Sequence, residues 1–266
     1  MEVREIEKSI IKKYRKKIWA KFVRAVKDYS LINENDVIAV CISGGKDSFL
    51  MAKCMQELKR HGQFKFDIKF LVMDPGYSEY DLDFIKKNCE ILNIDAIIFK
   101  SNIFEVLQQS KDEFPCYLCA KMRRGNLYAK AKELGCNKIA LGHHFNDVIE
   151  TIMLNIFYNG TFGGMPPKLF SDNFKGMELI RPLYLIKEED IKYWANSCNL
   201  EFMQCGCSVT KEKYASKRKE IKELIAKLKK DNANIDINIF RSIENVNLNT
   251  INGYDKDKEH YDLINK

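Results

Sequence analysis

The sequence predicts an α/β fold, a doubly wound and mostly parallel sheet with a basic helix before it and a helical extension after it. Two observations support this prediction. From Val37 onward, short apolar runs alternate with helical stretches, and such an alternation implies right-handed crossovers and a sheet covered on both faces. In addition, the glycine-rich residues 43–48 stand between the first apolar run and the first helical stretch, where such folds bind ligands.

Length and charge limit the function classes. The chain has 266 residues, with 44 Lys and Arg against 37 Asp and Glu, a formal net charge of +7. This size suits one α/β domain with an appendage, and the charge permits a polyanionic partner without proving one. No long apolar run is present, and residues 1–27 are charged throughout. Neither a membrane span nor a secretory signal is predicted, and we expect a cytoplasmic protein.

The first element, residues 6–29 within a predicted segment 1–30, is a basic amphipathic helix. Its apolar positions recur every four residues, and basic side chains fill most of the others. The apolar set is Ile10, Tyr14, Ile18, Phe22 and Val26. The basic face has two interpretations, an ordinary solvated surface or a surface that binds nucleic-acid phosphates.

The central elements form a predicted catalytic domain, residues 31–210. Its buried strands are predicted at Val37–Ile42, Ile68–Met73, Ile94–Phe99 and Lys138–Leu141. Helices are predicted between and after them at Asp47–Arg60, Tyr80–Leu92, Cys119–Leu134 and Asn146–Tyr158. Parallel strands end at one edge of the sheet, so Ser43, Asp74 and Gly142 are expected to lie along that edge.

The last part of the chain carries weaker signals. Residues 159–176 are rich in Gly and Pro and predict an irregular loop, either a lid or a surface insertion. A short strand at Leu179–Arg181 and a helix at Glu188–Asn196 follow. The final segment, 211–266, begins with a charged helix at Lys211–Lys230. Residues 231–266 lack a clear period and predict partial disorder.

The strongest chemical signal is the hexapeptide Ser43-Gly44-Gly45-Lys46-Asp47-Ser48. Glycines let backbone N–H groups approach phosphate oxygens, and the following helix adds its positive N-terminal end. The loop is not a Walker A motif, because Asp47 follows Lys46 and Val40 occupies the position of the first glycine. The pattern predicts an anion-binding loop and argues against a kinase or a motor NTPase.

The nine cysteines fall into two groups. Five lie in apolar patterns and are predicted to be buried thiols without a chemical role, namely Cys41, Cys54, Cys89, Cys136 and Cys198. The other four form a CxxC pair, Cys116 and Cys119, and a later CGC pair, Cys205 and Cys207. Four thiolates suit structural zinc, and three suit a [4Fe-4S] cluster with one open iron. From chemistry alone the choice stays open.

Several motifs together resemble a known family. SGGKDS resembles the pyrophosphate-binding loop of the PP-loop ATP pyrophosphatases. CYLCAKMRRGNLY, KIALGHHFNDVIETIMLNIFYNG, GGMPPKL and IRPL then follow in the order seen in the tRNA 2-thiocytidine synthetase (TtcA) family. The similarity covers residues 5–209. It implies that ATP adenylates a tRNA cytidine, at position 32 of the anticodon loop, and that sulfur replaces oxygen to give 2-thiocytidine.

The resemblance also implies cofactors, partners and site residues. It assigns a [4Fe-4S] cluster to Cys116, Cys119 and Cys205, with ATP, Mg²⁺ and catalytic roles for Lys46, Asp47 and Asp147. The implied partners are tRNA and a sulfur donor such as a cysteine desulfurase or sulfide, with a homodimer left open. The implied ATP-binding residues are Ser43, Gly44, Gly45, Lys46, Asp47, Ser48, Asp74, Gly142 and His143.

Some assignments keep alternatives. The family usually has CxxC at the later site, so Cys207 could replace Cys205 as the third ligand. An Asp-Gln pair is common where this chain has Asp74-Pro75, which weakens the adenosine contact expected there. Asp147 and His143 could instead be a helix cap and a packed histidine.

Two competing functions remain beside cytidine thiolation. The first is thiolation of a tRNA uridine by the same chemistry. The second is a zinc-stapled protein that binds nucleotide and RNA without turnover. A ligase with an amine nucleophile, of the lysidine type, would have no need for the cysteine set.

Overall fold

The computed structural model describes residues 2–62, 65–109, 115–203, 214–257 and 259–264, with side chains throughout except at 108–109, 115–117 and 214–216. Predicted residues Cys205 and Cys207 lie outside this part of the chain, and Cys116 is described by its backbone alone. Within the described residues, no helix combines the length and apolar character needed to cross a bilayer.

A six-stranded sheet forms the centre of the molecule, in the order β3-β2-β1-β4-β6-β5. All neighbouring pairs are parallel except β5 with β6. The strands are β1 Val37–Ile42, β2 Asp67–Asp74, β3 Ala96–Lys100, β4 Lys138–Ala140, β5 Lys168–Phe170 and β6 Glu178–Ile180. The predicted doubly wound, mostly parallel sheet is therefore confirmed.

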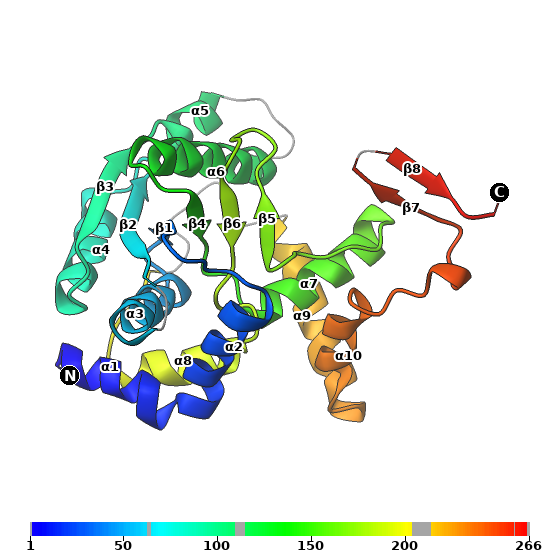
Figure 1. Ribbon diagram of the computed structural model, residues 1–266, viewed down its shortest axis with the longest axis horizontal. Helices are drawn as coiled ribbons and strands as arrows, with labels where there is room; N and C mark the ends of the chain where they lie inside the picture. The colour runs from blue at the N-terminus through cyan, green and yellow to red at the C-terminus, as the bar shows by residue number, and fades with distance from the viewer. Residues whose placement is uncertain (1, 63–64, 110–114, 204–213, 258, 265–266) are drawn as a thin grey trace.

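Helices cover both faces of the sheet (Figure 1). Helix α6 (Pro115–Glu133) packs on one face through Tyr128 and Ala131, and α5 (Ile103–Gln109) contacts α6 beside it. The N-terminal helices and α3 lie on the opposite face, where the larger apolar core forms. The other helices are α4 Glu79–Ile91, α7 Phe145–Leu154, α8 Glu188–Ser197, α9 Tyr214–Asp231 and α10 Ile235–Ser242, with α3 at Lys46–His61.

The order of the strands reverses at β1. In register, Val40 of β1 pairs with Phe70 of β2 on one side and with Ala140 of β4 on the other. Strands β2 and β3 lie on one side of β1, and β4 and β6 lie on the other side. Ligands bind at the carboxyl ends of the strands at such a switch point. Residues that follow β1 and β4 therefore flank the expected ligand position.

The N-terminal helix differs from its prediction in one respect. It is interrupted, running as α1 (Val3–Lys8), two π-helical segments (Ser9–Lys13 and Arg15–Trp19) and α2 (Ala20–Asp28). A repeat of four advances by about 40° per step around an α-helix, so a straight α-helix would carry the apolar set off one face. Wider π turns correct this drift. All five apolar residues predicted to face the core are buried.

In three regions the structure contains elements that were not predicted. The loop at 159–176, predicted to be irregular, contains the edge strand β5, which begins just after Pro166 and Pro167. Helix α5 also carried no clear sequence signal. Residues 231–266, where the sequence predicts partial disorder, form α10, a 3₁₀ turn at Leu248–Thr250, and a hairpin of β7 (Gly253–Lys256) and β8 (Glu259–Asp262) near the C-terminus (Figure 1).

The five cysteines predicted to be inert are buried. Burial raises the pKa of Cys41 to about 12 and that of Cys89 to about 11, and it also raises the pKa of Cys54, Cys136 and Cys198. A thiol that stays protonated is a poor nucleophile and a poor metal ligand. These five residues are therefore packing residues, as predicted.

Candidate active site

The glycine-rich loop makes a tight turn between β1 and α3. Gly44 has φ +84°, and a Cβ atom there would come within 3.0 Å of Ile85 and 3.2 Å of Met203. Inside the turn, Ser48 Oγ donates to the Gly45 carbonyl at 2.8 Å and accepts the Ser43 N–H at 3.2 Å. Hydrogen bonds of Ser43 and Ser48 therefore stabilise the turn. The N-terminus of α3 is in position to bind an anion.

A cavity of about 370 Å³ opens at the carboxyl ends of β1 and β4. Gly142 sits where the two segments meet, because a Cβ atom there would lie 3.2 Å from the Ser48 nitrogen. The opposite wall is α6, which contributes residues three and four apart. The lining residues are Cys41, Ile42, Ser43, Asp47, Ser48, Met73, Ala120, Arg123, Arg124, Leu127, Leu141, Gly142, His143 and Asp147. Its volume and mixed lining suit a small-molecule ligand.

His144 stands between the two carboxylates of this edge. Its backbone N–H donates to Asp147 at 2.9 Å, and its Nδ1 accepts the Asp147 backbone N–H at 3.4 Å, which forms a reciprocal cap at the start of α7. A neutral imidazole that accepts at Nδ1 carries its proton on Nε2, and Nε2 lies 3.8 Å from Asp47 Oδ1. The capping interpretation of Asp147 is therefore correct, and the same side chain also lines the cavity.

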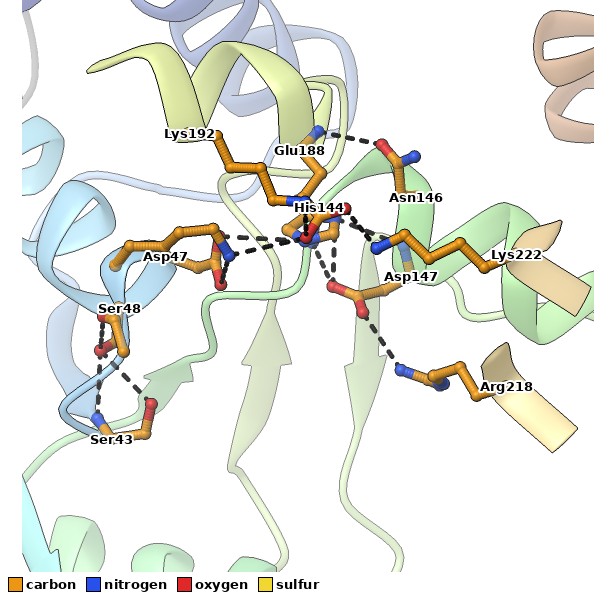
Figure 2. Close-up of polar contacts among 12 residues, drawn as sticks. Ser43, Asp47, Ser48, His144, Asn146, Asp147, Glu188, Lys192, Arg218 and Lys222 are labelled. Atoms are coloured by element: carbon orange, nitrogen blue, oxygen red, sulfur yellow. Dashed lines mark hydrogen bonds and ion pairs between the residues drawn. The ribbon is translucent and has the colours of Figure 1, made fainter. Parts of the chain in front are cut away.

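A polar network surrounds these carboxylates and brings α8 and α9 to the site (Figure 2). Glu188, at the start of α8, lies 3.8 Å from Lys46 Nζ, and it is hydrogen-bonded by Lys222 and paired with Lys192 at 3.0 Å. Burial alone would raise the pKa of Glu188, but hydrogen bonds from Lys222 and Lys192 outweigh burial and lower it to about 2. The carboxylate therefore stays ionised and holds three cations at the rim.

Helix α9 also contacts two acidic residues of α7 through one arginine. Arg218 lies 3.2 Å from Asp147 Oδ1 and 3.8 Å from Glu150 Oε2. Glu150 is buried, and burial raises its pKa to about 7, with Arg218 acting in the opposite direction. Arg218 thus holds Asp147 from the side opposite to His144 (Figure 2).

Asp47 Oδ1 and His143 Nδ1 are buried polar atoms at the cavity that have no hydrogen-bond partner among the described residues. Burial lowers the pKa of His143 to about 4, so its ring is neutral at neutral pH. Leaving such atoms unsatisfied is costly. A bound ligand or metal with complementary groups would satisfy both.

The first cysteine pair lies next to this cavity. Cys116 is in the first turn of α6, four residues before Ala120, which lines the cavity. Cys119 is buried among Met73, Ile103 and Leu107. Within the described residues no group of three or more His, Cys, Asp and Glu side chains is arranged to hold a metal ion.

The chain on either side of the second cysteine pair is fixed to the same edge. Before it, the Met203 N–H donates to the Gly44 carbonyl at 3.0 Å, two residues ahead of Cys205. After it, α9 begins at Tyr214 and reaches Asp147 through Arg218. Met203 and Arg218, which flank this segment in the sequence, therefore both contact residues of the candidate site.

The predicted residues separate into two sets. Ser43, Asp47, Ser48, Gly142, His143 and Asp147 line one cavity. Lys46 instead pairs with Asp47 at 3.0 Å, and Gly44 and Gly45 shape the turn. Asp74 does not line the cavity, because its Oδ1 accepts the N–H groups of Gly76 and Tyr77 in the turn after β2, and the neighbouring Met73 lines the cavity in its place.

Comparisons with known proteins agree with this geometry. The family model described as a PP-loop domain matches residues 14–242. The tRNA-cytidine(32) 2-sulfurtransferase of Coxiella burnetii (strain CbuG_Q212) is 37% identical over 242 residues, which is 88% of this chain and 91% of that protein. The chain belongs to the PP-loop family of tRNA-cytidine 2-sulfurtransferases. The predicted family is confirmed, and membership makes the chain an ATP-dependent enzyme of the sulfurtransferase class.

Other members and one solved structure extend the comparison. The tRNA-cytidine(32) 2-sulfurtransferase of Geobacter metallireducens is 34% identical over 225 residues, 84% of this chain and 87% of that protein. The structure of the U34-tRNA thiolase NcsA from Methanococcus maripaludis, with its [4Fe-4S] cluster, aligns with a TM-score of 0.68 at 24% identity. It covers 85% of this chain and 76% of the thiolase. At that identity the likeness shows a shared fold.

The sequence analysis missed the residues that α8 and α9 bring to the site. Glu188, Lys192, Arg218 and Lys222 lie in segments that are charged but carry no family motif. Their role depends on tertiary packing, since α9 reaches the site only after the chain has passed the second cysteine pair. No local pattern separates Arg218 from the neighbouring Lys217 and Lys219.

Proposed function

We propose that this enzyme converts a cytidine, at position 32 of the tRNA anticodon loop, to 2-thiocytidine at the cavity between β1, β4 and α6. One observation carries the proposal. The SGGKDS loop and the helix that bears Cys116 and Cys119 form opposite walls of one cavity. Activation of a base by ATP and delivery of sulfur need these two groups to face the same atom.

The first step is adenylation. The O2 atom of the base attacks the α-phosphorus of ATP, the bond to the β-phosphate oxygen breaks, and pyrophosphate leaves. The Ser43–Ser48 turn and the start of α3 would hold the phosphates by N–H groups and the helix N-terminus. Lys46, released from Asp47 and Glu188, would neutralise charge on the leaving pyrophosphate. His143 has a neutral ring whose Nδ1 atom has no hydrogen-bond partner among the described residues, so it is suited to a hydrogen bond with the nucleotide.

The residues also fit Mg²⁺. Asp47 presents a buried Oδ1 atom without a hydrogen-bond partner among the described residues, and Asp147 lines the same cavity. Carboxylate oxygens together with substrate phosphates are the ligands that Mg²⁺ prefers. The metal would stabilise charge on the phosphates, and Asp47 and Asp147 would hold it.

The second step replaces the adenylated oxygen. A sulfur nucleophile forms a bond to C2 of the base, the bond from C2 to the oxygen breaks, and AMP leaves with that oxygen. A [4Fe-4S] cluster bound by three thiolates would present sulfide at an iron that has no protein ligand. Cys116, Cys119 and Cys205 are the proposed ligands, with Cys207 as the alternative to Cys205. The apolar surroundings of Cys119 fit such a group, because they exclude water.

Nucleoside mass spectrometry of tRNA from cells with and without this gene tests the proposal. Loss of 2-thiocytidine alone is the expected result. Loss of a thiouridine instead would reassign the base, and an unchanged profile would overturn tRNA thiolation. Sulfide or a cysteine desulfurase is the proposed sulfur source, and omission of each from a reconstituted reaction distinguishes them.

A further inference from the structure

The positive charge of this protein is concentrated in one segment. Nine of the 44 basic residues, and none of the 37 acidic residues, lie between Lys8 and Lys27, here called the basic segment. The rest of the chain therefore carries 35 basic and 37 acidic residues, a formal net charge of −2. The overall charge of +7 comes entirely from this segment.

The structure turns most of these cations outward. The side of the basic segment toward the core is apolar and buried, with Ile10, Ile18 and Phe22 inaccessible to solvent. Lys12, Arg15 and Lys16 are exposed, at helical positions three and four apart, and form no ion pair with any described residue. Cations that the fold leaves unpaired on one face form a positive surface for an external anion.

The basic segment is joined to the catalytic edge. Lys17 and Lys21 each lie 3.3 Å from the buried carboxylate of Asp190 on α8. Asp190 is two residues after Glu188, which contacts Lys46 at the phosphate loop. A rigid helix thus connects the positive surface to the candidate active site.

An aromatic side chain lies at this junction. Tyr193 of α8 is 61% exposed, with Lys17 Nζ 5.6 Å from its ring centre, and its backbone carbonyl accepts a hydrogen bond from Tyr14. Exposed aromatic rings among cations are the composition that proteins use to bind RNA, since cations contact phosphates and rings stack on bases.

We propose that the outer face of the basic segment, centred on Lys12, Arg15 and Lys16, binds the phosphate backbone of the tRNA substrate while the modified base enters the cavity. The proposal rests on the function proposed above for its choice of RNA. The segment would span roughly 28 Å as an α-helix, long enough to contact phosphates on several successive nucleotides. It would contribute affinity without contacting the reacting base.

The test is tRNA binding by the full-length protein as a function of salt concentration. The variant combines Lys12→Gln, Arg15→Gln and Lys16→Gln. The control combines Lys87→Gln, Lys132→Gln and Lys175→Gln, three exposed lysines on α4, on α6 and before β6 that form no ion pair with any described residue. Both variants lose three positive charges, so a difference between them reports position and not net charge.

We expect the first variant to bind unmodified tRNA at least about tenfold more weakly, with the slope of log K against log salt concentration smaller by about 2 to 3. The control variant should change the slope by less than about 1. At saturating tRNA the first variant should retain the wild-type kcat for thiolation, with a raised KM. Equal losses in the two variants, or an unchanged slope in the first, would overturn the proposal.

Thiolation by the wild-type enzyme, followed in the same samples, separates this inference from the proposed function. If the wild type binds tRNA with the expected slope but forms no thionucleoside, the proposed function fails and the binding surface stands. If both triple variants bind and thiolate tRNA as the wild type does, the proposed function stands and the binding surface fails.

Discussion

Two groups of cationic side chains in this protein differ in whether they form ion pairs. At the catalytic edge, Lys46, Lys192, Arg218 and Lys222 are each paired with a carboxylate. In the basic segment, Lys12, Arg15 and Lys16 are exposed and form no ion pair with any described residue. The paired cations hold Asp47, Asp147 and Glu188 in place at the site. The unpaired cations remain available to a partner.

The two groups of cations are also expected to affect different steps, turnover in one case and tRNA binding in the other. A network of charges around a cavity holds groups where a reaction needs them, and its loss lowers kcat. A face of exposed cations attracts a polyanion from a distance, and its loss lowers the association rate and the affinity. Substitutions at the cavity should therefore alter turnover, and substitutions in the basic segment should alter tRNA binding.

The largest effect is expected at the cysteines. Cys119→Ala should abolish thiolation and lower bound iron, because Cys119 is a proposed cluster ligand. Cys198→Ala, a matched change at another buried cysteine, should leave both unchanged. Iron content and 2-thiocytidine formation after anaerobic purification measure the two effects.

The same assay applies to the other cysteines. Cys116→Ala and Cys205→Ala should each abolish thiolation, and Cys207→Ala should not. Full activity in Cys205→Ala would show that the third ligand has been assigned to the wrong residue.

Asp47→Ala comes next. We expect kcat to fall by about 10² to 10³, the usual effect of losing one electrostatic group in an active site, because the variant loses a carboxylate that would hold Mg²⁺ at the phosphates. Bound iron should remain at the wild-type level. Asp67→Ala, which removes an exposed carboxylate paired with Lys59, serves as the control and should be fully active. Loss of iron in Asp47→Ala would mean that the residue supports the cluster region instead.

Arg218→Ala should have a smaller effect, because Arg218 acts through Asp147. We expect a loss of about tenfold in kcat, equivalent to about 1.4 kcal/mol, with partial recovery in Arg218→Lys since the charge is retained. Lys219→Ala changes an exposed neighbour on the same helix and should behave as the wild type. A rise in KM for tRNA with unchanged kcat would instead place Arg218 at the RNA surface.

The smallest effect concerns stability and pH. Burial raises the pKa of Glu150 to about 7, above its ordinary value near about 4.3. Between these two pKa values the native state binds more protons than the unfolded state. The free energy of unfolding therefore falls as the pH rises from about 4.5 to 7, because the buried carboxyl must then ionise. Glu150→Gln removes the charge.

Relative to the wild type, Glu150→Gln should gain about 2 to 3 kcal/mol of unfolding free energy between pH 5 and pH 8. Urea denaturation at the two pH values measures the gain. Glu133→Gln, at an exposed position on α6, should show no such difference. An equal gain in both variants would contradict the burial of the Glu150 charge.

The fold and much of the cavity followed from local sequence signals. Five of the six strands of the sheet were predicted within two residues of their observed starts and ends, because each is a short apolar run bounded by turns or charged residues. The edge strand β5 was missed, since its three residues pair only because β6 lies beside them. The N-terminal π turns were missed for a related reason, as burial against the sheet selects them over a straight helix.

Site residues within a sequence motif were predicted. Site residues that only tertiary packing brings to the site were missed. Ser43, Asp47 and His143 lie in motifs that follow strands, so the edge of the sheet brings them together. Arg218 and Glu188 contact Asp147 and Lys46, respectively, from helices that are distant in the sequence. Asp74 has the expected position at the end of β2, but a turn engages its carboxylate, and no sequence pattern indicates that competition.

The most direct test of the central claim is a single-turnover reaction with purified, anaerobically reconstituted enzyme, tRNA transcript, ATP and sulfide. We predict one 2-thiocytidine formed for each AMP and pyrophosphate released, with none formed when Cys119 is replaced by Ala and with formation slower by about 10² to 10³ when Asp47 is replaced by Ala. AMP release without any thionucleoside in the tRNA, or thiolation that proceeds without ATP, would contradict the account.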